Sequence, residues 1–485
     1  MSRARERKRV PELVFGGTAL LMACFFIGEM DYCSRETPGL QIAEMTAGFA
    51  LLILLAFPAV RLFRDRIRLR RGRLVLLLAA AIIPRVIWWT AVPPRIDSDY
   101  GLYVRLASEY AAQGTIGIDN YLLTVAPNAA LYAVLLGLLM RVFGISALTA
   151  QAACMAAHVG NIFLLYGIGK KITSTRRAFL AAFLFALLPE NVFYSTLPGV
   201  EAFALCTMLA GLLLVLCAEG KDVIPQALLW LGGGMLLTFS ACIRPNAWAA
   251  AAAAVIWLPG RKAAAGFIRR KGLLLLAFAL GAAAVLLWHQ AFRDMIFAGA
   301  KPANGIGWTL YEGLDLESGG RWTQEKSNRC IEVIGAYSPA EANRIFLDEA
   351  MARFRGYSLI EKIRLFLRKE GSLWYESRYS LFSVEGPGTV TVEAFRKLND
   401  FTAFAWAGCL AAWIRCLIYR SRHFISWEHR AGCMICLFIV LATSAWHAAA
   451  TSIGRYHYML IPFVLLMLGM MLPGRGEEKS PVKER

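Results

Sequence analysis

The most constraining feature of this sequence is a series of apolar blocks, most of them close to the length that spans a lipid bilayer. A spanning helix needs about 20 mostly apolar residues, because the hydrocarbon core is about 30 Å thick. The blocks recur along the whole chain and lie at 13–30, 40–60, 74–92, 126–143, 150–168, 177–196, 201–217, 226–243, 246–259, 273–290, 401–419, 431–447 and 456–473. This pattern predicts an all-α polytopic membrane protein with about 12 transmembrane helices.

The charged residues are arranged as in a membrane protein. Only 18% of the residues are charged and 58% are hydrophobic, whereas a soluble domain carries about 25% charged residues. The net charge is +18, and basic residues gather in short loops beside the apolar blocks, as in 61–73. Enrichment of this kind marks cytoplasmic loops. We therefore expect a multi-pass protein of the plasma membrane, with both termini cytoplasmic and no nucleic-acid partner.

This orientation places residues 93–125 and 291–400 outside, which constrains the blocks between them. Seven blocks lie between residues 126 and 290, but two external ends require an even number of crossings. At least one block is therefore re-entrant, or two neighbours form one broken helix. Breaks are indicated at Pro189, Pro198 and Arg244-Pro245, and irregular backbone is tolerated only beside protein or a wet cavity.

The pattern divides the chain into four segments. Residues 1–60 form an additional helical hairpin, and residues 61–290 form a transmembrane core that includes the external loop 93–125. Residues 291–400 are a large external loop region. Residues 401–485 hold the last transmembrane helices and a basic cytoplasmic tail.

Helix signals are also present in the external segments. Capping boxes that begin at Ser338 and Ser358 predict short helices at 339–355 and 359–370. In the first external loop, apolar residues at helical spacing predict an amphipathic helix on the membrane surface. These residues are Tyr100, Tyr103, Leu106, Ala107 and Tyr110.

Asp97 and Asp99 are the first candidates for chemistry. They follow a predicted spanning helix, where a membrane-borne substrate and an aqueous acceptor can meet. An ionised carboxylate at this place can act as a general base or bind a metal. The alternative is a solvated loop that begins a helix, with Ser98 or Asp99 as its cap.

Other candidates lie at the ends of the apolar blocks. Glu201 and Arg244 border such blocks, where ionisable side chains tend to face a cavity or a partner. Arg455 and Tyr456 begin the last block, and a guanidinium there can bind phosphate through two parallel hydrogen bonds. Arginine and tyrosine are also common helix-end anchors. Together with Arg95, the arginines are candidate ligands of an anionic substrate.

Known cofactor and metal motifs are not found in the sequence. The six histidines have no zinc-binding spacing, and there is no P-loop or dinucleotide fingerprint. No cofactor is therefore predicted. The two aspartates are compatible with a divalent metal, although no spacing of ligands supports one.

The run Ser98–Ala107, in which Tyr103 follows Asp99 by four residues, resembles the first-external-loop motif of the GT-C membrane glycosyltransferases. It is most similar to the bacterial branch of glycosyltransferase family 39, which is related to protein O-mannosyltransferases and aminoarabinose transferases. Further stretches that resemble the family are Ala126-Pro127-Asn128, Leu188-Pro189 followed by Glu201, Ile243-Arg244-Pro245, Gly307–Leu314 with Gly319–Trp322, and Arg455-Tyr456. The resemblance covers roughly residues 74–475.

This resemblance implies a GT-C-like fold and transfer of a sugar from a polyprenyl-phosphate carrier to an acceptor hydroxyl or amine at the external face. Asp99 would deprotonate the acceptor for a single inverting displacement. The substrates would contact Tyr103, Arg95, Glu201, Arg244, Arg455 and Tyr456. The acceptor would be a glycan, a lipid or a protein. The usual Asp-Glu pair is Asp99-Tyr100 here, so a second carboxylate would come from Asp97 or elsewhere.

Two other classes of function fit a polytopic membrane chain. A transporter or flippase would move a lipid-linked or small anionic substrate. Transporters commonly show inverted repeats with paired broken helices, and the sequence shows no such symmetry. A non-catalytic membrane subunit would leave Asp97, Asp99 and the Arg244-Pro245 break without a role.

Overall fold

The computed structural model describes residues 70–92, 94–117, 120–256, 267–297, 302–375 and 427–471. Within these ranges the elements are helices, with no β-strand among them. The predicted hairpin 1–60 and the predicted span 401–419 lie outside the described residues.

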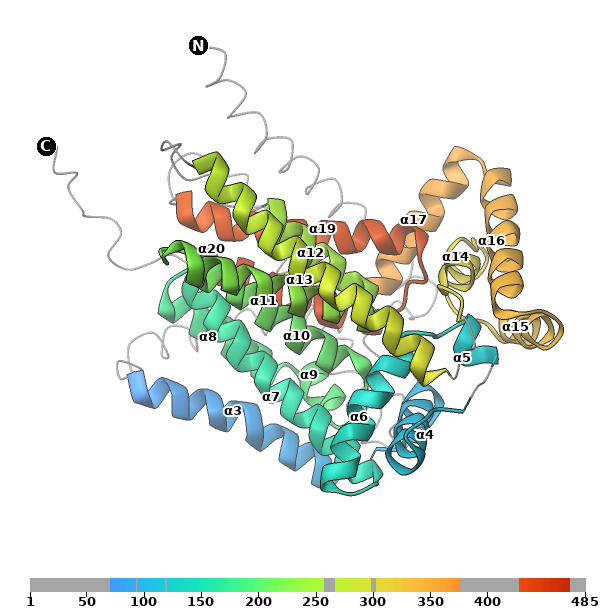
Figure 1. Cartoon of the computed structure of the whole chain (residues 1–485), viewed down its shortest axis with the longest axis horizontal. Coiled ribbons are helices and arrows are strands. Elements are labelled where there is room, and N and C mark those ends of the chain that lie inside the picture. Colours follow the sequence, from blue (N-terminus) through green and yellow to red (C-terminus); the bar gives the residue numbers. More distant parts are fainter. Residues whose placement is uncertain are drawn as a thin grey trace, which may run out of the picture.

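The described residues include six helices that are long and apolar enough to cross a membrane. They belong to α3 (Arg70–Ala91), α7 (Ala147–Ile172), α10 (Val200–Cys217), α11 (Val223–Ile243), α13 (Phe267–Ile296) and α19 (Trp427–Ala449). Shorter apolar helices are α6 (Ala129–Phe143), α12 (Trp248–Ile256), which follows the 3-10 helix η1 (Pro245–Ala247), and α20 (Ile461–Met471). In Figure 1 the long helices form one bundle. The predicted class, an all-α polytopic membrane protein, is confirmed.

Small residues let the helices of the bundle approach closely. A side chain at Gly234 on α11 would meet the backbone oxygen of Phe278 on α13 at 2.3 Å. A side chain at Gly281 on α13 would meet the oxygen of Leu231 at 2.2 Å. Close backbone packing of this kind holds helices together where lipid offers no hydrophobic driving force.

The helix α6 resolves the uneven number of predicted blocks. Its Arg141 donates a 2.8 Å hydrogen bond to the carbonyl of Tyr110 on α4, and its Tyr132 hydroxyl lies 3.2 Å from the Cys154 sulfur near the start of α7. Only residues 144–146 separate α6 from α7. Both ends of α6 therefore lie at the end of the bundle where α7 begins. The block 126–143 therefore lies across this end of the bundle, and the six blocks that remain in this region are an even number, as the predicted orientation requires.

The predicted block 177–196 is broken at its proline. α8 (Thr175–Leu187) ends before Pro189, which opens the short helix α9 (Pro189–Tyr194). Arg85 of α3, fully buried, donates to the carbonyls of Ala186 at 3.0 Å and Asn191 at 3.5 Å. These bonds satisfy carbonyls that the break releases from the helix. The chain then turns into α10, whose first turn holds Glu201.

One end of the bundle carries shorter helices: α4 (Ser98–Gln113), α5 (Asn120–Thr124), α14 (Ile306–Gly313), α15 (Gln324–Ala336), α16 (Pro339–Gly356) and α17 (Leu359–Tyr375) (Figure 1). The helices predicted at 339–355 and 359–370 are confirmed as α16 and α17. Both begin with the expected capping pair, Ser338 with Glu341 and Ser358 with Glu361.

The amphipathic helix predicted in the first external loop is α4, but protein covers its apolar face. Tyr100, Tyr103, Leu106 and Ala107 are all buried. The oxygen of Ala107 lies so close to Gly137 of α6 that a side chain there would meet it at 2.7 Å. The helix is therefore fixed in the fold, and its first turn has a defined position.

Candidate active site

Asp99 lies in the first turn of α4, and 39% of its side chain is exposed. The residue before it, Ser98, has a φ of +50°. This left-handed conformation costs a non-glycine residue about 1–2 kcal/mol, and such strain is concentrated at functional sites. The start of a helix also favours an ionised carboxylate.

Arg455 reaches Asp99 from the other end of the sequence. It lies in η3 (Gly454–Met459), the 3-10 helix between α19 and α20, and only 11% of its side chain is exposed. Its Nη2 donates to Asp99 Oδ2 at 2.6 Å, and its Nε lies 3.4 Å from Glu201 Oε1. The arginine therefore joins α4 to α10. Its positive charge holds the pKa of Asp99 below the ordinary value.

A second arginine completes the group. Arg244 follows the last residue of α11, directly before Pro245, and pairs with the same Glu201 oxygen. The Glu201 side chain is 9% exposed and pairs with both guanidinium groups, whereas Asp99 pairs with that of Arg455. We call Asp99, Glu201, Arg244 and Arg455 the charge cluster. Two positive and two negative charges make it neutral.

Aromatic rings support the cluster. The guanidinium carbons of Arg244 and Arg455 lie 5.2 and 5.7 Å from the centre of the Tyr456 ring, within the range of cation–π attraction. The His447 ring stacks on the Tyr456 ring, with ring centres 4.9 Å apart, and its Nε2 atom accepts a 2.9 Å hydrogen bond from Asn246 Nδ2. Since the His447 Nδ1 atom donates to the Thr451 carbonyl, the imidazole holds Tyr456 in place.

Of the remaining predicted site residues, Tyr103 is buried, whereas Arg95 and Asp97 lie at the surface. Tyr103 is buried in α4 and packs edge-on against Tyr132 of α6, with ring centres 5.2 Å apart. Its position, one turn after Asp99, supports the start of the helix. Arg95 and Asp97 pair with each other at 3.4 Å on the surface, with side chains 66% and 41% exposed. They are not among the ion pairs of the charge cluster, and Asp97 is the N-cap residue of α4.

The short helices at this end of the bundle add a buried carboxylate, Glu312. Glu312 of α14 accepts a 2.9 Å hydrogen bond from the hydroxyl of Thr451, which lies four residues before Arg455. The backbone N–H of Thr451 donates to the carbonyl of Thr309 on α14. Burial raises the pKa of Glu312 to about 7, and the negative charge of Asp99 adds to this effect. The two carboxylates are therefore close enough to influence each other.

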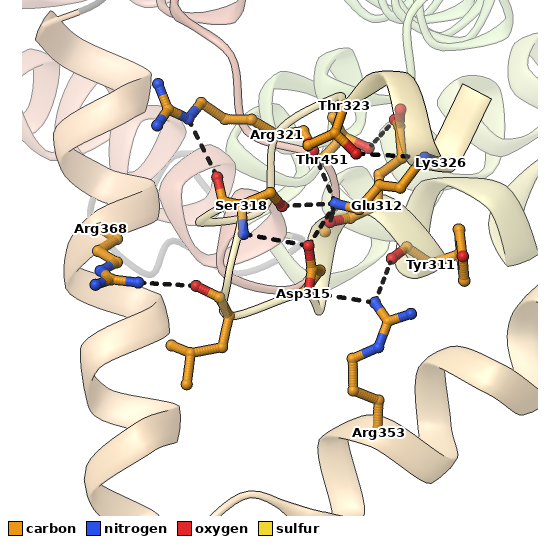
Figure 2. A network of polar contacts seen from close by, with 12 residues as sticks. Tyr311, Glu312, Asp315, Ser318, Arg321, Thr323, Lys326, Arg353, Arg368 and Thr451 are labelled. Carbon is orange, nitrogen blue, oxygen red and sulfur yellow. Dashed lines mark hydrogen bonds and ion pairs between the residues drawn. The ribbon is translucent and has the colours of Figure 1, made fainter. Parts of the chain in front are cut away.

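Figure 2 shows the polar network that fixes the end of α14. The Lys326 ammonium lies 2.8 Å from Asp315 Oδ2 and donates to the Ser318 hydroxyl at 2.6 Å and the Arg321 carbonyl at 2.8 Å. Arg353 lies 3.6 Å from Asp315 Oδ1. Because these groups are largely buried, the network holds the loop after Glu312 in one conformation.

A metal site is not indicated among the residues that the structure describes. In these ranges, no three histidine, cysteine, aspartate or glutamate side chains gather closely enough to hold an ion. Instead, each carboxylate of the cluster faces an arginine. Guanidinium groups at this place can bind the oxygens of a phosphate, and Asp99, the more exposed of the two cluster carboxylates, can accept a proton.

Comparisons with known proteins give matches in structure and none in sequence. No family model matches the chain, and no curated protein matches it. ArnT from Cupriavidus metallidurans, bound to undecaprenyl phosphate, is similar over 83% of this chain and 78% of ArnT, with 12% identity and a TM-score of 0.38. The archaeal oligosaccharyltransferase AglB from Archaeoglobus fulgidus, in complex with an inhibitory peptide and a dolichol-phosphate, is similar over 79% of this chain (11% identity, TM-score 0.36).

The arabinosyltransferase EmbB from Mycobacterium smegmatis is similar over 84% of this chain, with 16% identity and a TM-score of 0.34. This chain covers 56% of AglB and 45% of EmbB. These neighbours are GT-C fold glycosyltransferases, the class that the sequence motifs resemble.

Three residues of the site were not assigned from the sequence. Asn246 directly follows Arg244-Pro245, and Glu312 lies within the stretch Gly307–Leu314 that resembles the family's external loop. The resemblance of that stretch indicates a functional loop, but it does not assign a role to Glu312. His447 lies in an apolar block, and a role for it can be inferred only from its contacts with Asn246, Thr451 and Tyr456 in the structure.

Proposed function

We propose that this chain is a membrane glycosyltransferase that moves a sugar from a polyprenyl-phosphate donor to an acceptor hydroxyl or amine. The observation that supports it most is the position of Asp99, a partly exposed carboxylate that touches Arg455 at one end of a bundle of membrane-length helices. A lipid donor suits this place, because its tail can remain in the bilayer while its phosphate reaches the arginines.

The arginines supply the charge that the reaction needs. When the bond between the sugar and the phosphate breaks, negative charge develops on the departing phosphate. Fixed positive groups that are already in place stabilise such charge without reorganisation. Arg244 and Arg455 both face Tyr456 and share Glu201, so they are preorganised in this sense.

Asp99 supplies the base. We propose that its carboxylate takes the proton of the acceptor while the acceptor oxygen or nitrogen forms a bond to the anomeric carbon. The bond from that carbon to the phosphate oxygen breaks at the same time, and the lipid phosphate leaves with the electron pair. One displacement inverts the anomeric configuration and needs no covalent intermediate.

The proposal extends to the orientation of the site at the external face of the plasma membrane. Basic residues gather at the opposite end of the bundle, where Lys170 and Lys171 end α7. Arg270 donates to the Lys221 carbonyl there, between the start of α13 and the turn after α10. Since such loops remain cytoplasmic, the charge cluster faces outside. Cys330 cannot report this orientation by labelling, because it is buried.

The proposal is tested with purified protein and a panel of undecaprenyl-phosphate hexoses and pentoses, with a cell-envelope extract as acceptor. The wild type should release undecaprenyl phosphate and label the extract. Asp99→Asn should lose about 10²–10⁴-fold in rate, the usual contribution of a general base. Glu109→Gln removes an equal charge from the same helix, where Glu109 pairs with Arg105 and accepts a hydrogen bond from the Gly117 N–H, and should retain activity.

Two results would contradict the proposal. One is near-normal transfer by Asp99→Asn at matched protein levels. The other is the absence of transfer with every donor, combined with movement of the intact donor across proteoliposomes. The second result would identify a transporter.

A further inference from the structure

We infer that the ion pair between Asp99 and Arg455 is the donor-free state of the site, and that the donor's phosphate takes the place of Asp99 on Arg455 and thereby frees the base. This inference rests on the proposed function and describes how the same site is regulated. It makes binding of the lipid phosphate a condition for proton transfer.

The charges of the cluster require such an exchange. The two arginines already form ion pairs with the two carboxylates. Arg455 lies 2.6 Å from Asp99 Oδ2 and 3.4 Å from Glu201 Oε1, and Arg244 pairs with the same Glu201 oxygen. A phosphate that joined this neutral group would bring uncompensated negative charge into a largely buried place, which is strongly unfavourable. Phosphate can gain full contact with Arg455 only if a carboxylate leaves the guanidinium.

Asp99 is the carboxylate that can leave. Its side chain is 39% exposed, so water can solvate it after release, and Arg455 is its partner in the cluster. Glu201 is 9% exposed and is held by both arginines. Moving Glu201 would leave a buried negative charge unpaired, whereas moving Asp99 would not.

The exchange also changes the chemistry of Asp99. While the pair is closed, the Arg455 charge holds the pKa of Asp99 low and engages its Oδ2 atom. A carboxylate in this state is a weak base. Once phosphate neutralises Arg455, the main cause of the low pKa is removed and the oxygen is free to accept a proton. The base is then active only when a donor is bound.

The test measures binding of undecaprenyl phosphate to the full-length protein in detergent. Asp99 competes with phosphate for Arg455, so Asp99→Asn should bind undecaprenyl phosphate more tightly than the wild type by up to about 5-fold, the upper end of the range for a partly exposed ion pair. Asp99→Glu keeps the competing charge and should bind like the wild type. Glu109→Gln is the matched control and should also be unchanged, and Arg455→Lys should bind more weakly.

The outcomes separate the inference from the proposed function. If the wild type binds and Asp99→Asn binds equally or less tightly, the exchange is refuted while the function stands. If the wild type does not bind undecaprenyl phosphate at all, both fail. Asp99→Ser provides a second uncharged variant if Asp99→Asn does not fold. Competition by inorganic phosphate at equal strength would show that the site recognises the free anion and not the lipid.

Discussion

The buried carboxylate of Glu312 makes the stability of the protein around α14 dependent on pH. Its pKa is raised to about 7 from an ordinary 4.5 by burial, so the folded protein holds a proton that the unfolded chain has released. Folded stability should therefore fall as the pH rises from about 4.5 to 7, and remain low above that. A shift of this size corresponds to about 3 kcal/mol.

The substitution Glu312→Gln isolates this effect. Glutamine cannot ionise, but its side-chain oxygen can still accept the hydrogen bond from Thr451. At pH 8 the variant should be more stable than the wild type by up to about 3 kcal/mol, and at pH 5 the two should be nearly equal. Unfolding in mixed micelles with increasing SDS at both pH values measures the difference.

A matched control separates burial from charge. Glu332→Gln removes a carboxylate from α15 whose side chain is 69% exposed, and it should give the same small difference at both pH values. Our reasoning about Glu312 is refuted if Glu312→Gln is no more stable than the wild type at pH 8, or if its advantage is equally large at pH 5.

Three further predictions concern the cluster, the docking of α14 and the orientation. Arg244→Lys should lower transfer about 10- to 100-fold in steady-state assays, since an ammonium cannot replace the planar guanidinium between Glu201 and a phosphate. Gly313→Ala should reduce the yield of folded protein on size exclusion, because its side chain would meet the Ala449 oxygen at 2.3 Å, whereas Gly335→Ala has open space and should be tolerated. In intact cells an impermeant thiol reagent should modify Glu325→Cys and not Lys221→Cys; the reverse would overturn the orientation.

Local features of this fold could be predicted from the sequence because their causes are local. The capping boxes at Ser338 and Ser358 contain both partners within four residues, so α16 and α17 begin where expected. The helical spacing of the apolar residues after Asp99 likewise predicts α4, in which Asp99 lies in the first turn and Tyr103 is buried one turn later. Apolar composition also predicted the six described helices that are long enough to cross a membrane.

Long-range features could not be predicted because their partners are far apart in the sequence. Asp99 and Arg455 are 356 positions apart, and no spacing connects them. Arg95 and Arg455 are alike as residues near a predicted span, yet one is exposed and the other buried. The apolar α6 matches a spanning block in composition, and its contacts with α4 and with the start of α7 show that it lies at one end of the bundle.

The helices α14 and α17 and the segment that carries Arg455 are joined into one mechanical unit. Lys369 of α17 donates to the carbonyls of Gly313 on α14 and Ala448 on α19, and Thr451 joins α14 just before Arg455. An exchange of residues 302–375 between related chains would therefore separate the two partners of these buried hydrogen bonds. Chimeras should carry residues 446–459 together with residues 302–375, since the two stretches form one transplantable module.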